Sequence, residues 1–150
     1  MYLETETFKG IVKNTPLISI DLIVKNTHGK VLLGQRKNRP AKDYWFVPGG
    51  RIVKDETLEN AFQRLTQEEL GKVTSLKEAS FLGPYEHHYG DNFSGSDFST
   101  HYVVLGYEIL IDIDLDDLPS EQHGRYEWWD VDELLSSEVV HQNTKDYFLK

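Results

Sequence analysis

The most constraining feature of this sequence is an amphipathic segment that carries a carboxylate in the middle of its apolar face. Apolar side chains recur there at intervals of three and four residues, which predicts a helix; they are Leu58, Ala61, Phe62 and Leu65. At about 100° per residue, Glu69 falls within about 20° of Leu58 on the helical wheel. An ionised carboxylate in such a place is costly unless it is protonated or paired. Either the helix frays near Gly71, or a cationic group meets Glu69.

The rest of the chain predicts short strands around this helix. Thr57 can cap its start and Gly71 can end it in a left-handed conformation. Before it, residues 44–53 predict a strand broken at Pro48, Gly49 and Gly50, where the backbone can approach a ligand closely. Other strands are expected at 17–24, 31–34, 78–83, 102–111 and 125–131, with a long loop at 86–100 and a short helix starting near 132. We expect one mixed α/β domain over 1–150.

Length and composition exclude several classes of protein. The chain has 150 residues, of which 39% are apolar and 27% are charged. This composition is typical of a globular protein and not of a disordered or membrane-spanning one. The absence of cysteine removes disulfide frameworks, thiolate zinc sites and cysteine nucleophiles. The first ten residues are acidic and lack the apolar region of a signal peptide, so we expect a cytoplasmic protein.

The charge is unevenly distributed along the chain. The net charge is −9, yet residues 25–51 hold seven basic residues and one acidic residue and therefore carry +6, which leaves −15 for the remainder. A small anion could bind near this basic segment, whereas a long polyanion such as a nucleic acid would be repelled. The alternative is a solvated basic loop without a ligand.

One motif gives Glu69 a chemical setting. Six residues have the spacing of the Nudix box, Gly-x5-Glu-x7-Arg-Glu-apolar-x-Glu-Glu-x-Gly-apolar; they are Gly50, Glu56, Arg64, Glu68, Glu69 and Gly71. The chain thus resembles the Nudix hydrolase superfamily. The resemblance implies an α/β (α+β) Nudix fold, a mixed β-sheet sandwiched between α-helices with a loop-helix-loop motif. It also implies that helix carboxylates hold Mg²⁺, or Mn²⁺, beside a nucleoside diphosphate linked to another group.

Three residues of this sequence depart from the box, and they indicate which branch of the superfamily the chain resembles. Leu65 stands where the box has the Glu after its Arg, and Thr66 and Lys72 stand at the two apolar positions. In many members the missing Glu helps to activate the water that attacks phosphorus, whereas Leu65 can neither bind metal nor move a proton. A Leu at this position is a feature of the GDP-mannose mannosyl hydrolases, which the chain resembles over nearly its whole length.

The resemblance to this branch implies a set of catalytic and metal-binding residues. It places the metal on the Gly49 carbonyl, Glu69 and Gln122, with Glu68 as a further candidate from the wider box. It assigns His123 as the general base and groups three residues at the departing diphosphate: Asp21, His87 and Arg36. Without the resemblance, Asp21 is a half-exposed strand residue that shares a face with Ser19, and His123 is a loop histidine.

Further residues are implied for substrate binding. Arg36, Arg51 and Arg64 could clamp phosphate, although Arg64 could instead form a salt bridge with Glu68 or Glu56. Tyr102 resembles a tyrosine that donates to the diphosphate, with a core or rim tyrosine as the alternative. The branch uses the N-terminal arm near the nucleotide base, here Tyr2, Leu3 and Phe8, with help from a second subunit, so a homodimer is expected.

The expected reaction is hydrolysis of a GDP-hexose, GDP-mannose and also GDP-glucose being candidates, to GDP and free hexose with inversion. GDP leaves readily once its charge is neutralised, so the reaction needs a base that deprotonates water on the opposite face of the sugar. Histidine suits that role near neutral pH. Two alternatives stay open: a Nudix pyrophosphohydrolase that cleaves at phosphorus, and a catalytically silent nucleotide-sugar sensor.

Overall fold

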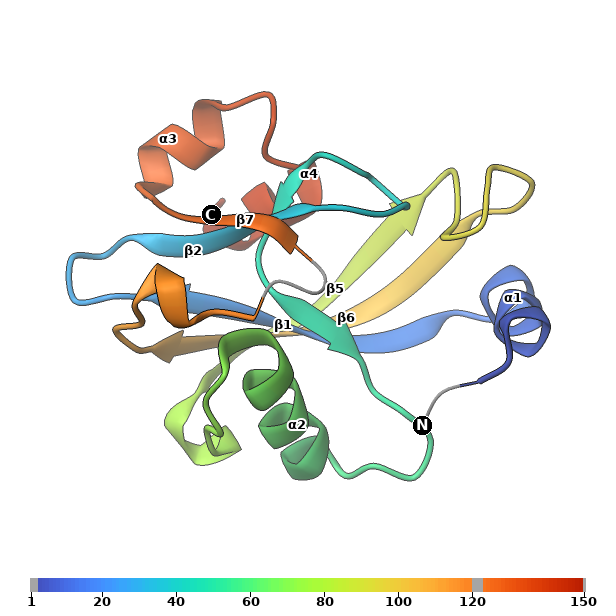
Figure 1. The fold of residues 1–150 in the computed structure, drawn as a ribbon, viewed down its shortest axis with the longest axis horizontal. Coiled ribbons are helices and arrows are strands. Elements are labelled where there is room, and N and C mark those ends of the chain that lie inside the picture. The colour runs from blue at the N-terminus through green and yellow to red at the C-terminus, as the bar shows by residue number, and fades with distance from the viewer. Residues whose placement is uncertain (1–2, 120–122, 150) are drawn as a thin grey trace.

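Seven strands form one mixed sheet in the computed structural model, which describes residues 3–119 and 123–149 (Figure 1). The strands are β1 (Leu17–Lys25), β2 (Val31–Arg36), β3 (Trp45–Phe46), β4 (Gly49–Arg51), β5 (Ser80–Tyr89), β6 (Thr100–Leu110) and β7 (His123–Trp129). They run in the order β3-β2-β1-β6-β5, with β4 paired to β1 and β7 paired to β2. β1 and β6 are parallel, and the other paired strands are antiparallel.

Helices cover both faces of this sheet. They are α1 (Thr5–Asn14), α2 (Leu58–Leu70), α3 (Val131–Ser136) and α4 (Gln142–Lys145), with single 3₁₀ turns η1 (Leu76–Glu78), η2 (Leu115–Asp117) and η3 (Asp146–Phe148). Figure 1 shows α2 on one side of the sheet and α3 and α4 on the other. The predicted mixed sheet sandwiched between helices is therefore confirmed.

The alternation of β1 divides the core into two clusters. Ile20, Leu22 and Val24 are fully buried and pack toward α2, in the cluster that holds Phe62. Ile23 points to the opposite face and packs in a second cluster that includes side chains of α3 and the C-terminal segment. Because side chains alternate along a strand, Asp21 lies on the second face, beside Ile23 and away from α2.

α2 has the predicted ends and retains its full length. Thr57 Oγ1 accepts a hydrogen bond from the Asn60 N–H at 3.1 Å, and Gly71 adopts the left-handed φ of 74°. The helix continues to Leu70, so it does not fray before Glu69. Glu69 is 4% exposed, as the helical wheel predicts for a residue on the apolar face.

The structure corrects one prediction about the chain outside α2, adds a helix and confirms a strand break. The loop predicted at 86–100 is confirmed only over 90–99, because β5 continues to Tyr89 and β6 begins at Thr100; these two residues pair directly. The polar side chains along 86–89 lack the pattern typical of a strand, and this part of β5 forms through its backbone pairing with β6. The N-terminal arm contains α1, a helix that was not predicted. The predicted break at Pro48 is confirmed, since it separates β3 from β4.

Candidate active site

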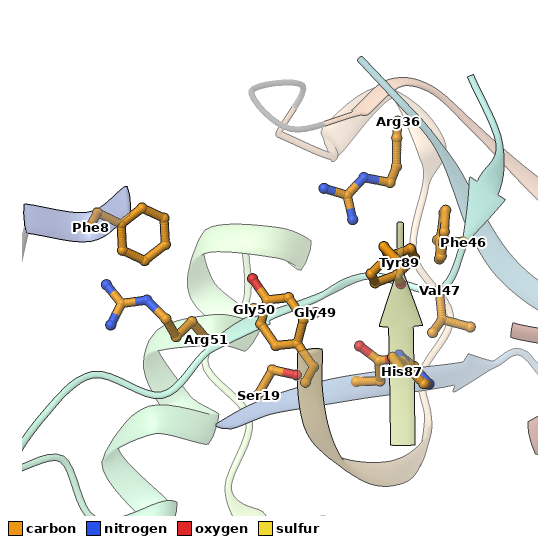
Figure 2. A pocket seen from close by; sticks show the side chains of 12 residues that line it. Phe8, Ser19, Arg36, Phe46, Val47, Gly49, Gly50, Arg51, His87 and Tyr89 are labelled. Carbon is orange, nitrogen blue, oxygen red and sulfur yellow. The ribbon is translucent and has the colours of Figure 1, made fainter. Parts of the chain in front are cut away.

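A pocket of about 220 Å³ opens on the face of the sheet opposite α2, where β1, β4, β5 and β6 meet (Figure 2). Its lining is Phe8, Ser19, Asp21, Arg36, Phe46, Val47, Gly49, Gly50, Arg51, His87, Tyr89 and Tyr102. The strand register explains the gathering, because β1 sets Asp21 opposite Gly49, and β5 sets His87 opposite Tyr102. The structure thus brings together most of the side chains that were predicted to bind the diphosphate.

Two arginines give the pocket its positive charge. The Arg51 guanidinium lies over the Phe8 ring, 5.0 Å from its centroid, and the Arg36 guanidinium lies 5.4 Å from the centroid of Phe46. Neither arginine forms an ion pair with a carboxylate of residues 3–119 or 123–149. Figure 2 shows them on either side of Gly49 and Gly50. Such a pair of guanidinium groups suits an anion with two phosphate groups.

Asp21 lines this pocket as a half-buried residue. Its Oδ2 accepts a hydrogen bond from the Tyr147 hydroxyl at 2.6 Å. Burial raises the pKa of Asp21 to about 7, against the lowering effects of the Tyr147 hydrogen bond and the Arg36 charge. Tyr147 comes from η3 and was not predicted at this site, because nothing in its local sequence indicates a contact with β1.

Glu69 approaches the same strand pair from the α2 side. Its Oε1 accepts a hydrogen bond from the Gly49 N–H at 3.2 Å. Burial is the main cause that raises the pKa of Glu69 to about 7, and the charges of Glu68 and Asp21 add to it. A cation beside this carboxylate would favour its ionised form.

The backbone of β4 presents an oxygen on the same edge as Glu69. Leu22 N–H donates to the Pro48 carbonyl and Ile52 N–H donates to the Ile18 carbonyl, both at 2.8 Å. Since hydrogen-bonded pairs alternate in antiparallel strands, the N–H and carbonyl of Gly49 both point away from β1. A Cβ at Gly49 would collide with the Asp21 carboxylate and the Ile20 carbonyl, so only glycine fits here.

A carbonyl and a carboxylate are the hard oxygen donors that Mg²⁺ prefers, so this edge fits the implied metal. Across the described chain, no three His, Cys, Asp or Glu side chains gather closely enough to hold a metal. A site here therefore depends on backbone or amide oxygen as well. Gln122, the third implied donor, lies outside the described residues.

Arg64 connects the loop before α2 to the helix. Its Nε lies 2.7 Å from Glu56 Oε2, its Nη1 lies 3.1 Å from Glu68 Oε2, and its Nη2 donates to the Arg51 carbonyl at 2.9 Å. The guanidinium also lowers the pKa of Glu56. This geometry favours the salt-bridge alternative for Arg64 over a direct phosphate contact, since its donors already hold Glu56, Glu68 and Arg51.

His87 is held neutral in the pocket wall. It is 5% exposed, and burial lowers its pKa to about 4. Its Nε2 is buried and has no hydrogen-bond partner among the residues that the structure describes. A neutral imidazole can still donate one N–H to a bound oxygen. Burial also raises the pKa of the facing Tyr102, which therefore keeps its hydroxyl proton at neutral pH.

The remaining assigned residues lie at or beyond the rim. Phe8 packs against Phe93 of the β5–β6 connection, with ring centroids 5.0 Å apart, and Phe93 was not predicted. Leu3 is half-buried and is not part of the pocket lining, while Tyr2 lies outside the described residues. His123 begins β7, where its backbone pairs with that of Arg36 at a register shift.

A second, more open hollow of about 520 Å³ shares Tyr89 with this pocket. Tyr44, His88 and His141 are among its lining residues. Within the described part of the chain, no helix has the length and apolar character needed to cross a membrane.

Two known proteins are similar to this chain over most of its length. Low-salt glycan biosynthesis protein Agl8 of Haloferax volcanii is 41% identical over 109 residues, which cover 73% of this chain and 68% of that protein. The ADP-ribose pyrophosphatase of Methanocaldococcus jannaschii is 29% identical over 134 residues, covering 88% and 73% of the two chains.

Solved structures share the fold at lower identity. The MutT protein from Methanosarcina mazei Go1 superposes with a TM-score of 0.72 at 20% identity, covering 90% of this chain and 92% of that one. The NUDIX domain of Shewanella oneidensis NrtR, solved with ADP ribose, gives a TM-score of 0.60 at 22% identity and covers 98% and 97%. A family model described as NUDIX domain matches residues 15–149. With this match over nearly the whole chain, and with the box residues Glu56, Arg64 and Glu69 joined around β4, the protein belongs to the NUDIX family.

Proposed function

We propose that this protein hydrolyses a GDP-hexose, GDP-mannose first, to GDP and free hexose by attack of water on the anomeric carbon. The observation that carries the proposal is the environment of Leu65. This side chain is 2% exposed in the α2 core, and a Cβ at Gly50 would lie 2.5 Å from its Cδ2. The box position that activates water in many relatives thus holds a packing residue, and a base must come from elsewhere.

The pocket supports a substrate with a diphosphate between two larger groups. The guanidinium groups of Arg51 and Arg36, which lie over the Phe8 and Phe46 rings, would hold the diphosphate. The Tyr102 hydroxyl would donate a hydrogen bond to it. Phe8 offers an aromatic face to the nucleotide base. The hollow beyond Tyr89 offers room for a hexose. The name of the Haloferax volcanii relative, which refers to glycan biosynthesis, favours a sugar as the linked group.

Mg²⁺, or Mn²⁺, would be held by the Gly49 carbonyl, Glu69 and Gln122, with Glu68 as a further carboxylate on the same helix. When bound, the metal would neutralise negative charge on the departing diphosphate. Arg36 would add a fixed positive charge there, and neutral His87 could donate a hydrogen bond to the same group. Asp21 would lie with them beside the departing diphosphate.

The proposed step balances as a single displacement. The water oxygen forms a bond to C1 of the hexose while the bond from C1 to the β-phosphate oxygen breaks. The electron pair of that bond leaves on GDP, and the water proton passes to His123. Attack from the face opposite the leaving group inverts the anomeric configuration. The pairing of β7 with β2 places the backbone of His123 beside Arg36, which supports a base at this end of the pocket.

A second reaction has support of its own. Glu68 and Glu69 are both present, and the Methanocaldococcus jannaschii relative is described as a pyrophosphatase that acts on ADP-ribose. A nucleotide-sugar pyrophosphohydrolase would release GMP and a hexose phosphate. A silent sensor would bind the nucleotide sugar and release nothing.

Hydrolysis of GDP-mannose with Mg²⁺ in oxygen-18 water distinguishes these functions. We expect the label in free mannose, together with unlabelled GDP. Label in a nucleotide or a sugar phosphate would instead establish cleavage at phosphorus, and binding without any product would establish a sensor. His123→Ala should lower kcat by about 10²–10⁴-fold, while the exposed turn variant His28→Ala should keep the wild-type rate. Light scattering would test the proposed homodimer.

A further inference from the structure

We infer that Tyr147, which lies in η3 and far in sequence from every box residue, is a positioning residue that fixes the Asp21 carboxylate in the pocket. The Tyr147 hydroxyl donates a hydrogen bond of 2.6 Å to Asp21 Oδ2. This contact joins the last helical turn of the described chain to the middle of β1. The role in catalysis rests on the proposed function, whereas the role in orienting Asp21 does not.

The Tyr147 ring packs in a confined space beside Asp21. The side chain is 9% exposed, and its ring meets Tyr85 edge-on at a centroid distance of 4.4 Å. Gly106 pairs with Asp21 across β1 and β6. A Cβ at Gly106 would lie 2.9 Å from Tyr147 Cε1, closer than real contacts allow. Glycine at 106 therefore leaves the space that lets the tyrosine reach the carboxylate.

The hydrogen bond also decides which oxygen faces the β4 edge. With Oδ2 engaged by Tyr147, Oδ1 is the carboxylate oxygen that a Cβ at Gly49 would strike. An aspartate side chain has few torsions, so one short hydrogen bond at one oxygen fixes the direction of the other. A side chain fixed before substrate arrives does not have to be ordered during the reaction.

The position of Tyr147 makes the C-terminal segment part of the pocket. Strands β1 and β6 bring Asp21 and Gly106 together, but the hydroxyl comes from η3, which follows α4. The ring belongs to the second core cluster, with Leu134 of α3 and Val140. The Tyr147 hydroxyl therefore connects the packing of α3 and α4 on the sheet to the Asp21 carboxylate in the pocket.

The test is a double-mutant cycle on GDP release from GDP-mannose. Tyr147→Phe removes the hydroxyl and keeps the ring, and we expect kcat to fall about 10- to 100-fold with KM little changed. In the Asp21→Asn background, the same change should have an effect of no more than about twofold, because the carboxylate it orients is gone. Tyr107→Phe, a buried tyrosine of the other core cluster, is the matched control and should stay near wild type.

Two further measurements make the result decisive. Gly106→Ala displaces the Tyr147 ring without altering either partner and should reproduce the loss of kcat. A crystal structure of Tyr147→Phe tests the orientation independently of turnover, and we expect the Asp21 carboxylate to rotate from its present direction. An unmoved carboxylate, or an equal loss of kcat with and without Asp21, would overturn the inference. Absence of GDP release by the wild-type protein would count against the proposed function alone.

Discussion

Replacing Glu69 with glutamine should make the metal-free protein more stable at alkaline pH. The side chain is 4% exposed, and burial raises its pKa from 4.5 to about 7. The amide of the variant would keep an oxygen that can accept the Gly49 N–H hydrogen bond, now 3.2 Å long, but it cannot ionise. The substitution thus removes the buried ionisable group while keeping the shape of the side chain.

The magnitude follows from the linkage between proton binding and folding. Because the pKa is higher in the folded protein than in the unfolded chain, Glu69 favours folding while protonated, and this stability is lost as the pH rises from 4.5 through about 7. One pKa unit corresponds to about 1.4 kcal/mol, so the loss amounts to about 3 kcal/mol well above pH 7. Glu69→Gln should avoid that loss and resemble the wild type near pH 4.5.

Urea unfolding in EDTA at pH 5 and pH 8.5 measures this difference. We expect the variant to exceed the wild type in free energy of unfolding only at pH 8.5. Mg²⁺ at 100 times its Kd should then stabilise the wild type by about 2.7 kcal/mol and the variant far less. Glu68→Gln, whose side chain is 50% exposed, controls for the change in net charge. An equal difference between the variant and the wild type at both pH values, or equal stabilisation by Mg²⁺, would contradict this prediction.

Three other changes test the packing around the pocket. Burial lowers the pKa of His87 to about 4, so its folding contribution is lost as pH falls from 6.5 toward 4, by about 3 kcal/mol at most; His87→Gln should flatten this part of a pH series of urea unfolding. Arg64→Lys should lower the free energy of unfolding by about 1–3 kcal/mol, because lysine cannot reproduce the two-pronged contact with Glu56. Gly50→Ala should cost about 1–3 kcal/mol by collision with Leu65, and calorimetry should show the cost shrinking in a Leu65→Ala background.

Local signals in the sequence were sufficient for α2 and for its buried carboxylate. The spacing of its apolar residues, the Thr57 cap and the left-handed Gly71 depend on neighbours within one or two helical turns. The same period places Glu69 on the buried face. Strand alternation in β1 likewise predicted that Asp21 and Ser19 share a face, and both line the pocket.

Contacts between distant parts of the chain could not be predicted in this way. β5 reaches Tyr89 because β6 pairs with it, although 86–89 contains polar residues that suggest a loop. The contact between Tyr147 and Asp21 joins residues 126 positions apart, and neither local pattern refers to the other. The Phe8 and Phe93 contact similarly needs α1 to pack near the β5–β6 connection.

The motif itself separates into positions that hold the scaffold and positions that decide the chemistry. Arg64 joins Glu56 to the Arg51 carbonyl, so this part of the box fixes the loop on α2 whatever reaction follows. Leu65 replaces an ionisable residue with an apolar one that fills the core beneath Gly50, so the fold gains packing while this position loses its base. A family match therefore establishes the scaffold, and the departure at Leu65 is the observation on which the proposed attack at carbon rests.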